Sequence, residues 1–147
     1  MRGVFLSMVQ EFKDDYPYWI AVHQTLGQSL NPYLSALLEA YGSFRDMWSA
    51  KDEIPVPGVP QRMRQKLIAA RKSLEPLTLW QECQKKGYGI VTCRDESFSK
   101  ELLQIYGYPC MLYYCGDLSL LNRPAVAIVG SRQASGYGLM QSQSFAK

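Results

Sequence analysis

The sequence predicts a mixed α/β protein, in which a small all-helical domain at residues 1–80 precedes the beginning of an α/β domain at residues 81–147. Two observations predict this division. Between about residues 16 and 80 the apolar side chains recur every three or four positions, which is typical of amphipathic helices. After residue 80 they form short continuous runs instead, as in strands that are buried on both faces. We therefore expect two regions of different architecture.

Capping residues divide the helical region into segments. The first amphipathic segment runs from Pro17 to Leu26. Asn31 is expected to cap the next helix, because Pro32 is favoured at a first helical position, and Gly42 is expected to end it. Ser43 is the expected cap of a short helix that follows. The pattern therefore predicts short helices joined by tight turns.

A proline-rich connector and a basic helix complete this region. Residues 54–60 read Ile-Pro-Val-Pro-Gly-Val-Pro, which predicts a turn, and residues 61–72 predict a helix. Residues 58–72 carry five basic and no acidic side chains, which makes them a candidate phosphate-binding segment. Packing, protein contact or a merely solvated helix face stay open as alternatives, since proline at position 60 removes an N–H group. The candidate auxiliary DNA-binding residues are Gly58, Arg62, Arg64 and Lys66.

Three apolar runs after residue 80 predict strands. They cover residues 88–93, 110–115 and 125–129, and residues 97–105 predict a helix between the first two. Continuous apolar runs of this length fit an α/β sheet whose two faces are covered by helices.

The third predicted strand leads into a motif that can carry chemistry. A strand that ends in a glycine turn before a helix has the geometry of a Rossmann-like phosphate loop. Gly130 lets an anion approach the backbone, while Ser131 and Ser135 offer hydroxyl groups and Arg132 offers a planar guanidinium. These residues alone leave open a nucleotide cofactor, a nucleic-acid backbone or a purely structural turn.

Several functions are not indicated by the residues. Cys83, Cys93, Cys110 and Cys115 contain no C-x-x-C pair, and His23 is the one histidine, so we expect no zinc or other metal site and free, reduced thiols. No acid–base or nucleophilic constellation is found, so we expect no catalytic residue and no cofactor. No apolar run reaches the length of a transmembrane helix. The net charge of +3 does not by itself identify a nucleic-acid binder.

Residues 109–121 and 126–138 together resemble the DprA/Smf family of DNA-processing proteins, in both order and spacing. The first segment reads P-C-M-L-Y-Y-C-G-D-L-x-L-L and the second V-A-I-V-G-S-R-x-x-S-x-Y-G. Upstream, Asp95-Glu96-Ser97-Phe98-x-x-x-Leu102 is similar to that family's D-x-x-Y-P-x-x-L segment, although it lacks the Tyr-Pro pair. The helical residues 19–71 resemble its N-terminal domain, which is sterile-alpha-motif-like or helix-hairpin-helix-like.

The resemblance implies a cytoplasmic bacterial protein that binds single-stranded DNA and is not an enzyme. Such a protein protects incoming DNA during natural transformation, assists the loading of the RecA recombinase, and forms a homodimer when full-length. Arg132 matches the family position that contacts DNA phosphate, with Gly130 and Ser131 shaping the pocket. The family's Rossmann-like domain continues further, so we expect this chain to be an N-terminal fragment. The alternative is a Rossmann-like nucleotide-binding or nucleoside-phosphate-binding enzyme.

Overall fold

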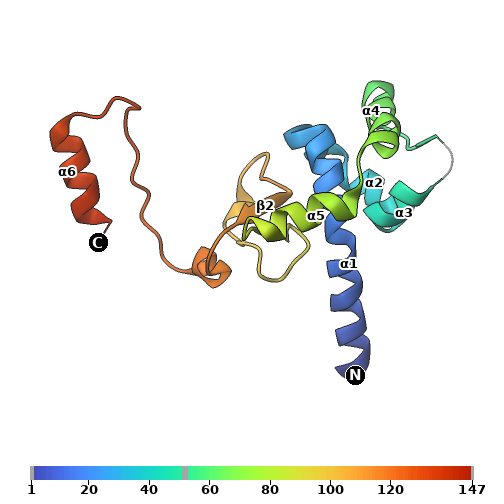
Figure 1. Cartoon of the computed structure of the whole chain (residues 1–147), viewed down its shortest axis with the longest axis horizontal. Coiled ribbons are helices and arrows are strands. Elements are labelled where there is room, and N and C mark those ends of the chain that lie inside the picture. The colour runs from blue at the N-terminus through green and yellow to red at the C-terminus, as the bar shows by residue number, and fades with distance from the viewer. Residues whose placement is uncertain (1, 51–52, 147) are drawn as a thin grey trace.

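The computed structural model describes residues 2–50 and 53–146, with side chains for 14–28, 30–50 and 53–146. The helices are α1 (Arg2–Leu26), α2 (Leu34–Tyr41), α3 (Phe44–Ser49), α4 (Gln61–Ser73), α5 (Pro76–Lys85) and α6 (Gly136–Phe145). Three short 3₁₀ helices, η1 (Gly27–Tyr33), η2 (Leu102–Gln104) and η3 (Leu118–Asn122), and two strands, β1 (Gly89–Thr92) and β2 (Met111–Tyr114), complete the described elements. This confirms the mixed α/β class, with a mostly helical first region. In Figure 1, α6 lies away from the body, at the end of an extended segment.

Helix α1 is longer than the predicted segment, because it runs through Pro17 instead of beginning there. A proline inside a helix costs one N–H hydrogen bond but fixes a helical φ angle, so packing of the residues around it can keep the helix intact. Two α1 side chains after the proline, Trp19 and Val22, are fully buried in the core. In Figure 1, α5 crosses α1, and α1 also packs against α3 and α4.

Asn31 is not a helix cap, contrary to the prediction. It lies within the 3₁₀ helix η1, and α2 begins at Leu34 without a side-chain cap. The Asn31 amide instead donates hydrogen bonds to the carbonyl oxygens of Gly107 and Tyr108, more than 75 residues along the chain. The side-chain nitrogen thus has long-range carbonyl partners, while the Oδ1, which would be the acceptor in a cap, has no hydrogen-bond partner among the described residues.

The turn between α2 and α3 is as predicted. Gly42 ends α2 with a φ angle of +77°, which is the left-handed conformation that favours glycine. Ser43 caps α3, since its Oγ accepts a hydrogen bond from the Asp46 N–H at 3.0 Å. The proline-rich connector and the basic helix also form, and α4 extends to Ser73.

The core joins the helices to the strand pair. Its largest fully buried side chains include Trp19, Leu37, Phe44 and Leu67, and residues of both strand segments belong to the same apolar cluster. These strand-segment members are Ile90, Cys110 and Met111. The division of the chain at residue 80 stays a prediction, and α5 spans that position.

The first two predicted strands form an antiparallel pair. Gly89 lies opposite Tyr114 and Thr92 lies opposite Met111. Burial on both faces holds for β1, whose last three residues are buried, but β2 has residues that are only partly buried or exposed. The predicted helix at 97–105 is reduced to the short η2, and the Ser99 hydroxyl accepts the Leu102 N–H at its start.

The third predicted strand is wrong in this structure. Residues 125–129 form no strand, and Val126 and Val129 expose 91% and 89% of their surface. A strand needs hydrogen bonds to a neighbouring strand, and no part of the described chain pairs with this segment. Among the described residues, the sheet therefore contains β1 and β2 alone, and the predicted helix-covered α/β sheet is not assembled.

The four cysteines are free and differ in accessibility. Cys115 is exposed, Cys83 and Cys93 are partly buried, and Cys110 is buried. Burial, followed by the neighbouring Cys93, raises the pKa of Cys110 to about 11. No described group of three His, Cys, Asp or Glu side chains is placed to hold a metal, and no described helix could cross a membrane.

These environments predict an order of alkylation. With iodoacetamide at about pH 8.5, Cys115 reacts first and Cys110 last, because a raised pKa leaves little of the reactive thiolate at that pH. Peptide mass spectrometry over time measures the order, and urea-unfolded protein is the control in which the four rates converge. Rapid labelling of Cys110 in the folded chain would contradict this packing.

Candidate nucleic-acid interface

The loop before α6 is ordered by its own serines. The Oγ of Ser131 accepts the Gln133 N–H at 3.2 Å. The Oγ of Ser135 accepts the Gly138 N–H at 3.2 Å, so Ser135 caps α6. The first N–H groups of a helix lack partners within the helix, and one serine satisfies only part of them. The loop therefore presents hydrogen-bond donors and the positive end of a helix dipole.

Three of the four predicted phosphate-binding residues line one pocket. Its volume is about 450 Å³. Gly130, Ser131 and Ser135 form part of its wall, and the rest comes from the end of the extended segment and from α6. The described wall holds no carboxylate, so no negatively charged side chain there repels an anion. Arg132 lies in the same loop and is exposed, but it does not line the pocket.

The second predicted group surrounds the start of α4. Gly58 adopts a φ angle of +81°, and the Val59 N–H closes the turn on the Val56 carbonyl at 3.2 Å. Arg62 and Lys66 lie one helical turn apart and are both exposed. They offer two cationic side chains on one face of the helix.

Some of the basic side chains in this segment have structural partners. Arg64 is half-buried, and its Nη1 lies 3.4 Å from the Ile54 carbonyl oxygen, to which it donates. Arg71 donates to the carbonyl oxygens of Met47 and Ala50, at the C-terminal end of α3. Some basic side chains of residues 58–72 therefore stabilise the fold, while others are exposed to solvent.

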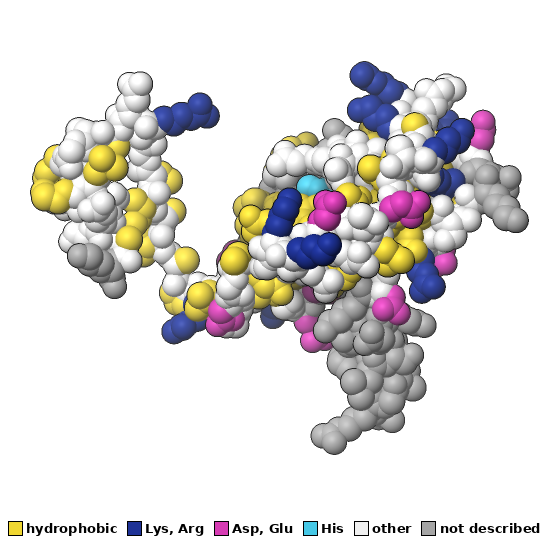
Figure 2. Space-filling model, in the orientation of Figure 1, with side chains coloured by type: hydrophobic (Ala, Val, Ile, Leu, Met, Phe, Trp, Pro, Cys, Tyr) yellow, Lys and Arg dark blue, Asp and Glu magenta, His cyan; other side chains and the backbone are white. Residues whose placement is uncertain are grey.

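The two predicted groups are not brought together. Figure 1 shows α4 and α6 at opposite ends of the molecule. In Figure 2, Lys and Arg side chains gather at the α4 end of the body. A ligand that touched both groups would have to cross the helical body.

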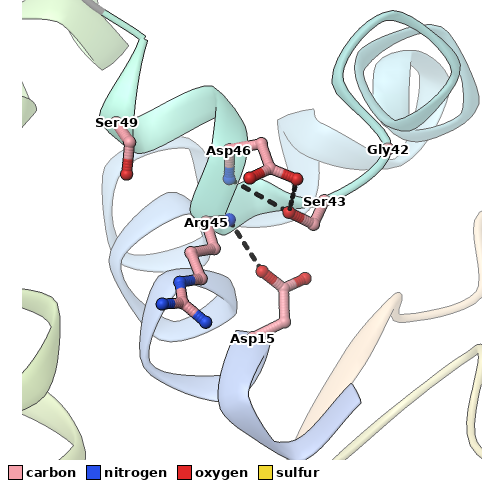
Figure 3. A pocket seen from close by; sticks show the side chains of 6 residues that line it. All are labelled: Asp15, Gly42, Ser43, Arg45, Asp46 and Ser49. Carbon is pink, nitrogen blue, oxygen red and sulfur yellow. Dashed lines mark hydrogen bonds between the residues drawn. The ribbon is translucent and has the colours of Figure 1, made fainter. Parts of the chain in front are cut away.

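A polar pocket at the turn between α2 and α3 went unpredicted. It has a volume of about 600 Å³ and is shown in Figure 3, lined by Asp15, Gly42, Ser43, Arg45, Asp46 and Ser49. The Asp15 carboxylate accepts hydrogen bonds from the Arg45 N–H at 2.7 Å and the Phe44 N–H at 3.3 Å. It also accepts one from the Trp19 Nε1 at 2.9 Å. The two carboxylates in its wall make this pocket unsuited to phosphate.

Burial raises the pKa of Asp15 by more than these three donors lower it. Burial therefore disfavours the ionised form of Asp15, and the hydrogen bonds offset this desolvation only in part. The same hydrogen bonds anchor the start of α3 to α1. The local sequence shows only the Asp15–Trp19 spacing of four residues, which is one helical turn. The contacts with residues 44 and 45 span about 30 positions and have no local signal.

Parts of the chain are similar to known proteins. Residues 89–147 match the family of the DNA recombination-mediator protein A. The chain is 30% identical over 128 residues to Protein Smf from Synechocystis sp., and the match covers 82% of this chain and 32% of that protein. It is 46% identical over 44 residues to the DNA processing protein DprA from Streptococcus pneumoniae, covering 30% of this chain and 16% of that one.

No solved structure gives a significant match. The chain spans about a third of the length of Protein Smf. The matched segment includes both strands, the loop at residues 130–135 and α6. The chain therefore belongs to the DprA/Smf family, and it covers only part of the length of its full-length relatives.

Proposed function

We propose that this chain acts in a single-stranded DNA-binding recombination mediator of the DprA/Smf type, and that the loop at residues 130–135 holds a backbone phosphate. The observation that carries the proposal is the serine-capped start of α6, which faces a pocket without carboxylates. Backbone N–H groups at a helix start, serine hydroxyls and a close glycine form an anion site that needs no metal. A DNA phosphate fits this chemistry.

Arg132 contributes from outside the pocket wall. Its exposed guanidinium can contact the same phosphate or the next one along a strand, and it makes charge-assisted hydrogen bonds in either case. Because the loop offers no base-reading pattern, we expect the contact made by the loop itself to show little sequence preference.

The start of α4 is proposed as an auxiliary contact. Arg62 and Lys66 are exposed and can follow a phosphate backbone, Gly58 shapes the preceding turn, and Arg64 adds charge while bonded to the connector. Since this surface lies far from α6, it would hold a separate stretch of the strand.

In this proposal the protein binds and hands over DNA without catalysing a reaction. By family membership, the full-length protein would protect incoming single strands in the cytoplasm during natural transformation, assist RecA loading and act as a homodimer. The contact with RecA and the homodimer are proposed from family membership alone.

Replacing Arg132 tests the proposal. For the 147-residue chain, we expect Arg132→Ala to weaken binding of a fluorescent single-stranded oligonucleotide about tenfold, since it removes a charge-assisted hydrogen bond. The slope of log affinity against log salt should become shallower by about 0.7 for each phosphate that the variant no longer neutralises. Fluorescence anisotropy at several salt concentrations measures both quantities.

Matched variants sharpen this result. Arg132→Lys keeps the charge but loses the planar guanidinium. Its slope of log affinity against log salt should therefore stay close to that of the unsubstituted chain, while its affinity for the oligonucleotide falls. Arg123→Ala removes another exposed cation and should change less. Unchanged affinity and slope in Arg132→Ala would overturn the phosphate loop. Stabilisation by a free nucleotide, without any oligonucleotide binding, would favour the enzyme alternative.

A further inference from the structure

A third pocket lies where α1, α5 and the strand pair meet. Its volume is about 290 Å³, and its wall combines apolar side chains of α1 and α5 with Gln24, Glu82, Cys83, Lys86, Tyr88 and Tyr113. We call it the tyrosine pocket. Figure 2 shows hydrophobic side chains together with Lys, Arg, Asp and Glu side chains on the face of the body that carries α5. The pocket therefore combines an apolar wall with charges of both signs.

Two tyrosine rings supply the aromatic part of the wall. Tyr88 directly precedes β1 and is 45% exposed, while Tyr113 lies in β2 and is 43% exposed. The Tyr88 N–H donates to the Cys83 carbonyl at 2.9 Å, and the Tyr113 ring packs edge-on against His23 with a 6.0 Å centroid distance. The fold thus holds the backbone of Tyr88 and the ring of Tyr113, while part of each residue stays accessible.

Polar groups sit beside the rings. Glu82 lies in the last turn of α5, and Lys86 follows directly after the helix. Both side chains are exposed. Both act on the Cys83 thiol: burial raises its pKa most, Lys86 lowers it and Glu82 raises it. Gln24 contributes to the wall from α1. A cation, a carboxylate and an amide therefore surround a small aromatic recess.

We propose that the tyrosine pocket binds one base of single-stranded DNA, with Tyr88 and Tyr113 as the stacking surface. This inference rests on the proposed function, because it names a second part of the strand that the protein would hold. Aromatic rings beside cationic side chains are the means by which single strands are bound without sequence readout, since every base has an accessible ring face. The volume is close to the lower end of small-ligand sites, which suits one ring system better than a folded segment.

The polar groups narrow the class of base. A carboxylate accepts hydrogen bonds from an exocyclic amino group, as carboxylate side chains do with cytosine, so Glu82 favours bases that carry one. Gln24 can donate and accept at the same edge. Lys86 is placed for the adjoining phosphate. We therefore expect cytosine, adenine or guanine to be preferred over thymine.

The test uses the deoxyriboside of 2-aminopurine, a fluorescent base with an exocyclic amino group and no phosphate. Stacking on tyrosine should quench its fluorescence as the 147-residue chain is added. Tyr88→Leu should weaken the quenching about tenfold, whereas Tyr88→Phe, which keeps the ring, should retain it. Circular dichroism of each variant checks the fold.

A second measurement does not depend on replacing a tyrosine. In a Cys115→Ser variant, the same nucleoside should slow labelling of Cys83 by a maleimide and leave Cys93 unchanged, because only Cys83 lines the pocket. Peptide mass spectrometry reports both sites. Quenching that survives in Tyr88→Leu, or Cys83 labelling that the nucleoside leaves unchanged, would overturn the base pocket.

The two proposals fail separately. An oligonucleotide of abasic sites has phosphates but no bases, so its binding reports on the phosphate loop and should fall in Arg132→Ala but not in Tyr88→Leu. The phosphate-free nucleoside should behave in the opposite way. Failure of the unsubstituted chain to bind the abasic oligonucleotide would overturn the proposed function while leaving the nucleoside result to decide the pocket.

Discussion

Asp15→Ala should lower the free energy of unfolding by about 3–5 kcal/mol, which is a large share of the stability of a small domain. The substitution removes the one acceptor of three donors, the Trp19 Nε1 and the N–H groups of residues 44 and 45. Buried donors left without an acceptor cost about 1–3 kcal/mol each, and the start of α3 loses part of its cap. Urea unfolding, followed by tryptophan fluorescence, measures the change.

Asp14→Ala is the matched control, because Asp14 is adjacent, exposed and equally charged. It should alter the stability by less than about 0.5 kcal/mol, as surface substitutions usually do. If Asp15→Ala were as mild as this control, the carboxylate would not be anchoring α3 to α1.

Asp95→Ala should detach the strand pair from α1 and lower the stability by about 2–4 kcal/mol. The Asp95 carboxylate accepts hydrogen bonds from the Thr92 N–H at 2.6 Å, the Thr92 Oγ1 at 2.7 Å and the Tyr16 hydroxyl at 2.8 Å. Thr92 is buried at the end of β1, so its two freed donors lose an acceptor that water can replace only in part. Amide hydrogen exchange in β1 and β2, together with urea unfolding, measures both effects.

Two further variants separate the parts of this contact. Tyr16→Phe removes only the link to α1 and should cost about 1 kcal/mol, while Glu96→Ala removes an exposed neighbouring charge and should cost less. Unchanged exchange rates in β1 after Asp95→Ala would show that the strand pair is held by its apolar contacts alone. The contact also gives a physical role to the aspartate of the Asp95–Leu102 segment.

Much of the local structure could be predicted from the sequence. Gly42 and Ser43 were identifiable because the end of one helix and the cap of the next depend on backbone conformation and a contact three residues away. Both strands of the pair were predicted from short apolar runs. The Ser135 cap of α6 is a local contact of the same kind. The caps and the helix end are decided within a few residues, whereas the two strands also needed each other as partners.

The candidate sites were predictable only in part. Gly130, Ser131 and Ser135 were expected together because they share one loop. The tyrosine pocket was not, because Tyr88 and Tyr113 become neighbours only through the antiparallel register of β1 and β2 and their packing on α1 and α5. The spacing of Tyr88 and Tyr113 in the sequence therefore does not predict that they line one pocket.

The sequence by itself determined the helical periodicity, the turns, the phosphate-loop motif and the family resemblance, since each depends on residue types at short range. The tertiary structure decided which polar groups are partners over long range: Asp15 with the start of α3, Asn31 with the loop at residues 107–108, and Asp95 with α1. It also decided that residues 125–129 stay extended and exposed, although their composition favours a strand. A helix satisfies its backbone within its own segment, whereas a strand depends on a neighbour that local sequence cannot supply.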